Sequence, residues 1–341
     1  MIMKDILKKL PKIELHCHLD GSVRPETMYE LLLASGEEVE AKNLEEFQKL
    51  ARVEENCESL KEYLKKFSYP LKVMQKGENI ERIAYELLED LHMQNVKYVE
   101  IRFAPFLSMA GGLNFDEVVE SVLRGMERAK KDFGIWSNAI LICMRHESKE
   151  NSMKVVEYGE KYLGRGVVAV DLAGNEHDFP PEIHREAFQL AYEKGFNITI
   201  HAGETGIVEN ITKSVNLLHA SRIGHGIAAI KDSGVIEFLK EKHIFLEMCP
   251  TSNLQTKAVE SLEEYPIKSF LESGLAVTVN TDNTTVSNTT LEKEYALLMD
   301  KFGFSIEDIL KLINNSVEAT FLSDEENDCL RKIIKKEVAR C

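Results

Sequence analysis

Short apolar runs rich in β-branched residues alternate along this chain with amphipathic stretches, and this alternation limits the possible folds more than any other feature. The runs that predict strands are about eight in number and cover residues 12–18, 97–105, 136–145, 167–174, 197–204, 222–226, 244–250 and 276–283. Stretches between them repeat apolar residues at helical spacing, as in 115–133, 152–163, 182–194 and 235–242. Alternating strands and helices with largely buried strands predict a parallel sheet, and eight such units can close into a barrel.

The predicted fold class is therefore α/β, a (β/α)8 TIM barrel. The chain length of 341 residues fits one barrel with insertions, so we expect a single domain over residues 1–341. The connection from about 24 to 95 is too long for one crossover and carries helix-like segments at 25–34, 44–51, 57–67 and 79–93. We expect this helical insertion after the first strand to form a lid over the barrel mouth. Extra C-terminal helices are predicted at 290–302, 306–319 and 325–340.

Histidines and one aspartate stand where the predicted strands end. His16 and His18 are spaced i, i+2, so in an extended strand both side chains point to the same side while Cys17 points away. Another strand candidate runs into His201, and a third runs into Asp282. Three imidazoles and one carboxylate at strand C-termini suit zinc or a similar divalent ion with an open position for water. Two further candidate strands lead to His225 and to Gly174.

Charge and composition exclude several classes of partner. The formal net charge of -15 argues against a general nucleic-acid or anionic-membrane surface, because both need basic residues. No apolar run approaches the roughly 20 residues that span a bilayer, and the first residues lack a signal-type apolar core. The six cysteines are scattered singly, as is typical of reduced thiols. We therefore expect a cytoplasmic protein that acts on small molecules.

The residues at these strand ends belong to motifs that resemble the adenosine deaminase family of metal-dependent aminohydrolases. The matching motifs occur in the family's order: His16-Cys-His18-Leu-Asp20-Gly-Ser, Asp171-Leu-Ala-Gly174-Asn-Glu176, His201-Ala-Gly-Glu204, Gly224-His225-Gly226, Cys249-Pro-Thr-Ser-Asn253 and Asn280-Thr-Asp282.

The resemblance implies a role for each of these positions. It implies that one Zn²⁺ is held by His16, His18, His201 and Asp282, with Asp282 also accepting a hydrogen bond from the attacking water. Glu204 would be the acid that protonates the purine ring, and His225 would orient the water or stabilise the developing oxygen charge. Gly174 would offer its backbone N–H to the purine, and Asp20, with His18 nearby, would contact the ribose.

A zinc-bound water is a suitable nucleophile for the deamination that the resemblance implies. Removing an aromatic amine at neutral pH needs a hydroxide, and zinc lowers the pKa of bound water toward about 7. The chain departs from many relatives at Asn283, where they carry a second aspartate. An amide NH₂ donates a hydrogen bond without any pKa shift, so Asn283 can keep the contact with the purine N7. No lysine ends the 167–174 strand candidate, which favours one metal over a lysine-bridged pair.

The resemblance implies zinc-dependent hydrolytic deamination of adenosine and 2′-deoxyadenosine, in purine salvage, with a purine nucleoside as partner and no nucleic acid or membrane. The alternative within the same chemistry is deamination of adenine or of a modified 6-aminopurine nucleoside, a choice that depends on the lid. Two other classes stay open: a barrel that binds a nucleoside or a protein partner without turnover, and a metal-dependent hydrolase of cyclic amides or esters. Glu204 together with Gly174 favours a purine. The sequence does not fix the oligomeric state.

Overall fold

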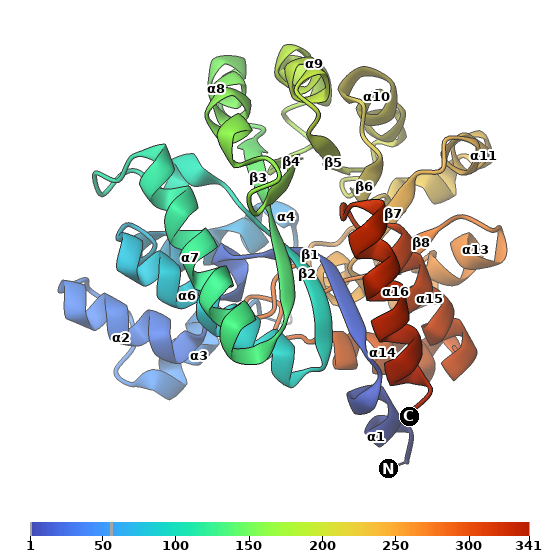
Figure 1. The fold of residues 1–341 in the computed structure, drawn as a ribbon, viewed down its shortest axis with the longest axis horizontal. Helices are drawn as coiled ribbons and strands as arrows, with labels where there is room; N and C mark the ends of the chain where they lie inside the picture. The colour runs from blue at the N-terminus through green and yellow to red at the C-terminus, as the bar shows by residue number, and fades with distance from the viewer. Residues whose placement is uncertain (1, 55–56, 341) are drawn as a thin grey trace.

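The computed structural model describes residues 2–54 and 57–340 and contains a barrel of eight parallel strands (Figure 1). Neighbouring strands follow the chain order: β1 (Lys12–His18), β2 (Val96–Phe103), β3 (Trp136–Met144), β4 (Val167–Ala173), β5 (Asn197–Ala202), β6 (Arg222–His225), β7 (Phe245–Met248) and β8 (Val277–Val279). The backbone N–H of Asp282 donates to the His16 carbonyl at 2.8 Å, and that of His18 donates to the Asp282 carbonyl at 2.7 Å. These bonds join the end of the sheet to β1, and the predicted TIM barrel is confirmed.

An outer layer of helices surrounds the strands. Figure 1 shows them arranged in chain order around the barrel: α6 (Gly77–Met93), α7 (Phe115–Phe133), α8 (Lys149–Gly159), α9 (Arg185–Glu193), α10 (Val208–Leu218), α11 (Ser233–Glu241), α13 (Ile267–Glu272) and α15 (Ile306–Glu318). The predicted helix 115–133 coincides with α7, which begins with a capping box between Asn114 and Glu117. Helices α10 and α13 were not predicted from the sequence. Helix α13 has only six residues, which are too few to establish a helical period in the sequence.

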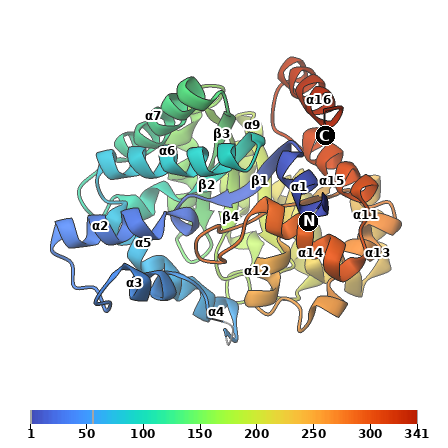
Figure 2. The same cartoon turned by 90° about the horizontal axis from the view of Figure 1, so that it is seen from below.

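The segment between β1 and β2 contains α2 (Pro25–Ser35), α3 (Leu44–Ala51), α4 (Leu60–Tyr63) and α5 (Ser68–Val73) before α6 returns to the barrel layer. Figure 2 shows α3, α4 and the short helix α12 (Pro250–Gln255) on the same side of the barrel. The predicted helix 57–67 is instead two short turns, α4 and a 3-10 helix over Leu64–Phe67.

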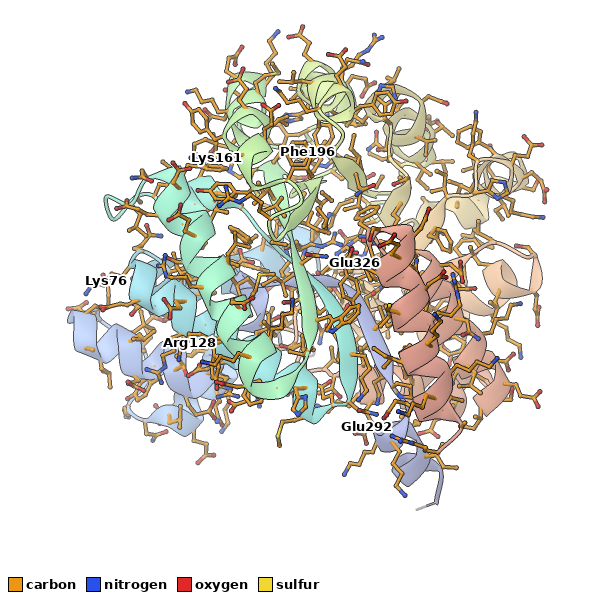
Figure 3. All side chains as sticks on the ribbon, viewed as in Figure 1. Lys76, Arg128, Lys161, Phe196, Glu292 and Glu326 are labelled. Carbon is orange, nitrogen blue, oxygen red and sulfur yellow. The ribbon has the colours of Figure 1, made fainter. Side chains whose placement is uncertain are left out.

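Three C-terminal helices, α14 (Leu291–Phe302), α15 and α16 (Asp324–Val338), follow the predicted segments within two residues at each end. The short helix α1 (Ile2–Lys9), which was not predicted, precedes β1. Charged side chains such as Arg128 and Lys161 lie on the periphery (Figure 3). Within residues 2–54 and 57–340, no helix is both long enough and apolar enough to cross a membrane.

Charged side chains fill the barrel interior beneath its C-terminal end. Arg102 on β2 pairs with Asp171 on β4 at 2.9 Å and with Glu247 on β7 at 2.8 Å, and all three are fully buried. Arg222 on β6 lies 2.7 Å from the other oxygen of Glu247 and 2.5 Å from Glu100. Buried charges of this kind need partners, and here arginines and carboxylates neutralise each other across the barrel. The network therefore fixes the strands on which the candidate site is built.

Candidate active site

Four side chains predicted to bind metal converge at the C-terminal ends of three strands. One potential ligand atom from each of His16, His18, His201 and Asp282 lies within 4.8 Å of the others. Nε2 of His18 is 3.1 Å from Nε2 of His201, and Oδ1 of Asp282 is 3.5 Å from His16 Nε2 and 3.4 Å from His18 Nε2. The structure thus brings together the residues that the sequence placed at separate strand ends.

The hydrogen bonds of these histidines fit a metal. Nδ1 of His16 lies 2.8 Å from Glu247, and Nδ1 of His201 lies 3.0 Å from Asp171. A carboxylate that accepts from Nδ1–H leaves Nε2 with its lone pair, the form that ligates metal. Nε2 of His16 is buried and has no hydrogen-bond partner among the described residues. A cation between these nitrogens and Asp282 would satisfy all of them, so the donor set fits zinc.

Protonation of the cluster favours the same interpretation. Burial lowers the pKa of His18 well below its usual range, and the neighbouring His201 and His16 lower it further despite the opposing charge of Asp282. Burial opposes ionisation of Asp282, but the interactions with His16 and His18 outweigh it and hold the pKa of its carboxyl well below the usual range. A neutral imidazole and an ionised carboxylate are the forms that bind metal.

The backbone near the cluster is strained at two positions. His225 and Asp282 both lie in the left-handed region, at φ 63° and φ 62°, which residues other than glycine adopt at a cost of about 1–3 kcal/mol. The strand predicted over 276–283 is shorter in the structure and ends at Val279, and Asp282 forms an isolated β-bridge with Cys17 of β1. Gly224 permits close packing here, because a Cβ at this position would lie 2.9 Å from Cε1 of His16. The local backbone thus aims both side chains at the cluster.

Helix α12 and the residue after it contact three of the predicted catalytic residues. The hydroxyl of Ser252 donates to Oδ2 of Asp282 at 2.6 Å, which leaves Oδ1 facing the histidines. Asn253 Nδ2 lies 2.9 Å from Nδ1 of His225, and Thr256 donates to Oε1 of Glu204 at 2.9 Å. The other oxygen of Glu204 lies 3.7 Å from Nε2 of His225. The Cys249-to-Asn253 motif therefore positions Asp282 and His225, and Thr256, just beyond it, positions Glu204.

Glu176, in the motif after β4, organises the loop that carries Glu204. Its carboxylate accepts hydrogen bonds from the backbone N–H groups of Gly203, Glu204 and Thr205 at 2.6 to 3.0 Å. It also accepts from the side chain of Asn210 at 3.0 Å. Such a set of donors to one buried carboxylate fixes the loop. Glu204 is thereby held in the cavity lining that also contains three of the candidate metal ligands, His18, His201 and Asp282.

A cavity of about 460 Å³ opens over the cluster. Its polar lining contains all the predicted substrate residues, namely His18, Asp20, Gly174 and Asn283, together with Glu204 and His225. Its apolar lining comes from the barrel rim and from the insertion, which contributes Leu60, Tyr63, Leu64, Phe67 and Leu71. The volume falls in the range of small-molecule sites.

Asp20 and Asn283 each direct an unpaired oxygen into buried surroundings. Burial raises the pKa of Asp20 to about 6, although the backbone N–H groups of Asp20 and Gly21 oppose the shift. Oδ1 of Asp20 has no hydrogen-bond partner within the described part of the chain, and neither has Oδ1 of Asn283. Buried polar atoms without partners are rare, so Asp20 is well suited to bind a polar ligand.

Sequence reasoning assigned no role to the residues that orient the predicted ones: Asp171, Glu247, Arg102, Ser252, Thr256 and Tyr63. A signal for the first three was present, since charged residues inside apolar strands must find buried partners. Ser252 lies in one of the motifs quoted from the sequence, whereas Thr256 and Tyr63 carried no comparable signal, because threonine and tyrosine occur throughout the chain.

Comparison with known proteins agrees with this geometry. The family model described as adenosine deaminase matches residues 11–337. The adenosine deaminase of Clostridium kluyveri is 51% identical over 326 residues, which cover 96% of this chain and 94% of that protein.

Solved structures with the same fold include a cog1816 amidohydrolase from Burkhoderia ambifaria with bound Zn, at a TM-score of 0.90 and 26% identity, covering 99% of this chain and 93% of that one. The adenine deaminase of Arthrobacter aurescens has a TM-score of 0.88 and 26% identity over 97% of this chain and 98% of its own. Arabidopsis ADAL complexed with IMP has a TM-score of 0.87 and 27% identity over 98% of each chain.

Proposed function

Because this chain belongs to the adenosine deaminase family, we propose that it hydrolyses adenosine and 2′-deoxyadenosine to inosine and 2′-deoxyinosine with release of ammonia. The observation that carries the proposal is a cavity large enough for a nucleoside, which is lined by Glu204 together with His18, His201 and Asp282 of the histidine–aspartate cluster.

The resident metal in this proposal is one Zn²⁺ per chain, held by His16, His18, His201 and Asp282. A metal-dependent enzyme is consistent with the family and with the donor set. When bound, zinc lowers the pKa of water and supplies a hydroxide nucleophile at neutral pH. Glu247 and Asp171 would hold His16 and His201 in the ligating tautomer.

Glu204 acts as the acid in this mechanism. Attack at C6 is favoured when the adjacent ring nitrogen N1 gains a proton, and Glu204 gives up that proton as negative charge develops on its carboxylate. The hydroxyl of Thr256 already points at Oε1 and stabilises this charge without rearrangement. The Glu204 carboxylate then takes the proton of the oxygen that has added to C6 and passes it to the amine, which leaves as ammonia.

His225 and Asp282 orient the attacking water. Nε2 of His225 is within 3.7 Å of Glu204, and Oδ1 of Asp282 faces the histidine cluster. Both groups stand where the oxygen that attacks C6 must approach. Their strained backbone and their bonds to Asn253 and Ser252 fix that orientation.

The remaining cavity residues bind the substrate. We propose that Gly174 donates its backbone N–H to the purine, Asn283 donates to N7, and Asp20 with His18 contacts the ribose. The insertion over residues 24–95, part of the single domain 1–341, acts as a lid whose apolar side chains cover the nucleoside. We keep the cytoplasmic location as a prediction from the sequence.

Deamination of adenine or of a modified 6-aminopurine nucleoside is the second candidate. It is favoured by the adenine deaminase of the same fold, whereas the buried Oδ1 of Asp20, which has no hydrogen-bond partner among the described residues, favours a substrate with a sugar. The small-molecule partner is in either case a purine, as IMP is in the Arabidopsis relative.

Substitution of the proposed acid tests the function. Glu204→Gln keeps the size of the side chain but cannot release the proton, so we expect zinc to remain bound while adenosine turnover falls by about 100-fold or more. Metal content and the ultraviolet change on deamination measure both effects. Turnover near that of the wild type would place the acid elsewhere.

A further inference from the structure

We propose that Tyr63 of the insertion is a specificity-determining residue, which accepts one hydrogen of the Asn283 amide and leaves the other directed at N7 of the purine. The inference rests on the proposed function, since it assigns the recognition of N7 to a pair of residues. Tyr63 would thereby connect the insertion to the choice of ligand.

The contact itself is well defined. Nδ2 of Asn283 donates to the Tyr63 oxygen at 2.9 Å, across 220 positions of the chain. Both residues are 2% exposed, and both line the cavity. The Tyr63 hydroxyl also lies 2.7 Å from Oγ of Ser287, which can accept a hydrogen bond from it. Tyr63 can therefore donate to Ser287 and accept from Asn283 at the same time.

The opposite side of the amide is held by packing. A Cβ built on Gly21 would lie 1.7 Å from Oδ1 of Asn283, so the glycine backbone closes that side. The amide is thus confined between Gly21 and Tyr63. Nδ2 carries two hydrogens, and only the one bound to Tyr63 has a partner among the described residues. The second is available to a ligand acceptor.

An aspartate at position 283 would reverse the direction of this bond. When ionised, its carboxylate can only accept, so Tyr63 would donate to it and no hydrogen would remain for N7, whereas a protonated carboxyl could still donate to N7. The benefit of the Tyr63 hydroxyl for N7 recognition consequently depends on an amide at position 283. This dependence separates a recognition role from simple packing by the lid.

The test measures affinity for purine riboside and for 7-deazapurine riboside, which has C–H in place of N7. Neither ligand has an amine to lose, so the measurement needs no turnover. The quantity of interest is the ratio of the two dissociation constants, obtained by calorimetry on the zinc-loaded protein and on Tyr63→Phe, Asn283→Asp and the double variant.

We expect Tyr63→Phe to reduce the preference for the N7-containing ligand about 5- to 10-fold, the effect of one neutral hydrogen bond. At a pH high enough to ionise the new carboxyl, Asn283→Asp should reduce it as well, and adding Tyr63→Phe to that variant should cause no further loss. Tyr295→Phe is the matched control, because it removes a buried hydroxyl that has no hydrogen-bond partner among the described residues. Its ratio should equal that of the wild type.

Equal weakening of both ligands by Tyr63→Phe would make Tyr63 a packing residue and would overturn the inference. The inference would also be overturned if Tyr63→Phe reduced the preference for the N7-containing ligand equally in the wild type and in the Asn283→Asp variant. Adenosine turnover by the wild type is recorded separately, and its absence would refute the proposed function without affecting the affinity comparison.

Discussion

Thr256→Val tests how the protein prepares Glu204 for proton transfer. The substitution keeps the shape of a side chain that is 6% exposed and removes only its hydroxyl, which donates to Oε1 of Glu204 at 2.9 Å. In the proposed mechanism, negative charge grows on this carboxylate as its proton moves to the purine. The hydrogen bond therefore stabilises the transition state more than the ground state.

The size of the effect follows from the contact. A buried hydrogen bond to a charged group contributes about 1.5–3 kcal/mol, and each 1.4 kcal/mol corresponds to a factor of ten. We expect kcat for adenosine to fall by about 10- to 100-fold, with unchanged zinc content. Initial rates from the ultraviolet change and metal analysis of the same sample give both quantities.

The control is Thr320→Val, which removes another buried threonine hydroxyl, one bonded to the Val317 carbonyl at 3.1 Å and outside the cavity. It should leave kcat within about twofold of the wild type, because no charge develops near it. If Thr256→Val also retained kcat within that range, the argument that Thr256 stabilises charge on Glu204 would be refuted.

Three further predictions concern the metal, the purine contact and stability. His201→Ala should lower the zinc content measured by metal analysis, and a full complement would exclude its ligand role. Gly21→Ala should reduce kcat/KM for adenosine at least tenfold, because its Cβ would collide with Asn283; an unchanged value would contradict the packing described. Burial raises the pKa of Glu294 to about 7 from 4.5. Between these pH values the native protein retains a proton on Glu294 that the unfolded chain loses. The contribution of Glu294 to the free energy of unfolding therefore declines as the pH rises from about 4.5 to 7. The decline is about 3 kcal/mol, and urea unfolding of Glu294→Gln should lack it; the same pH dependence in both proteins would refute the assignment.

The strands and the gathering of the metal-ligand candidates could be predicted from local patterns. Buried runs such as 12–18 end in polar residues, and the C-terminal ends of parallel strands meet at one edge, so His16, His201 and Asp282 could be placed together. The end of β8 could not be predicted. Asp282 has a left-handed backbone conformation and exchanges backbone hydrogen bonds with His16 and His18 of β1, which are more than 200 residues away in the sequence.

Contacts between distant segments were also beyond local patterns. Tyr63 reaches Asn283 because the insertion folds back over the barrel, and Thr256 reaches Glu204 because α12 follows β7 at the same edge. No periodicity in the sequence encodes these distances. The apolar spacing of the insertion predicted helices there but could not show which side chains line the cavity.

The most direct test of the proposed function offers adenosine, 2′-deoxyadenosine and adenine to the purified protein, with and without a strong chelator, and follows the ultraviolet change. We expect chelator-sensitive deamination of both nucleosides and no reaction with adenine. Turnover of adenine alone would contradict the assigned substrate, and no reaction with any of the three by the zinc-loaded protein would contradict the proposed activity.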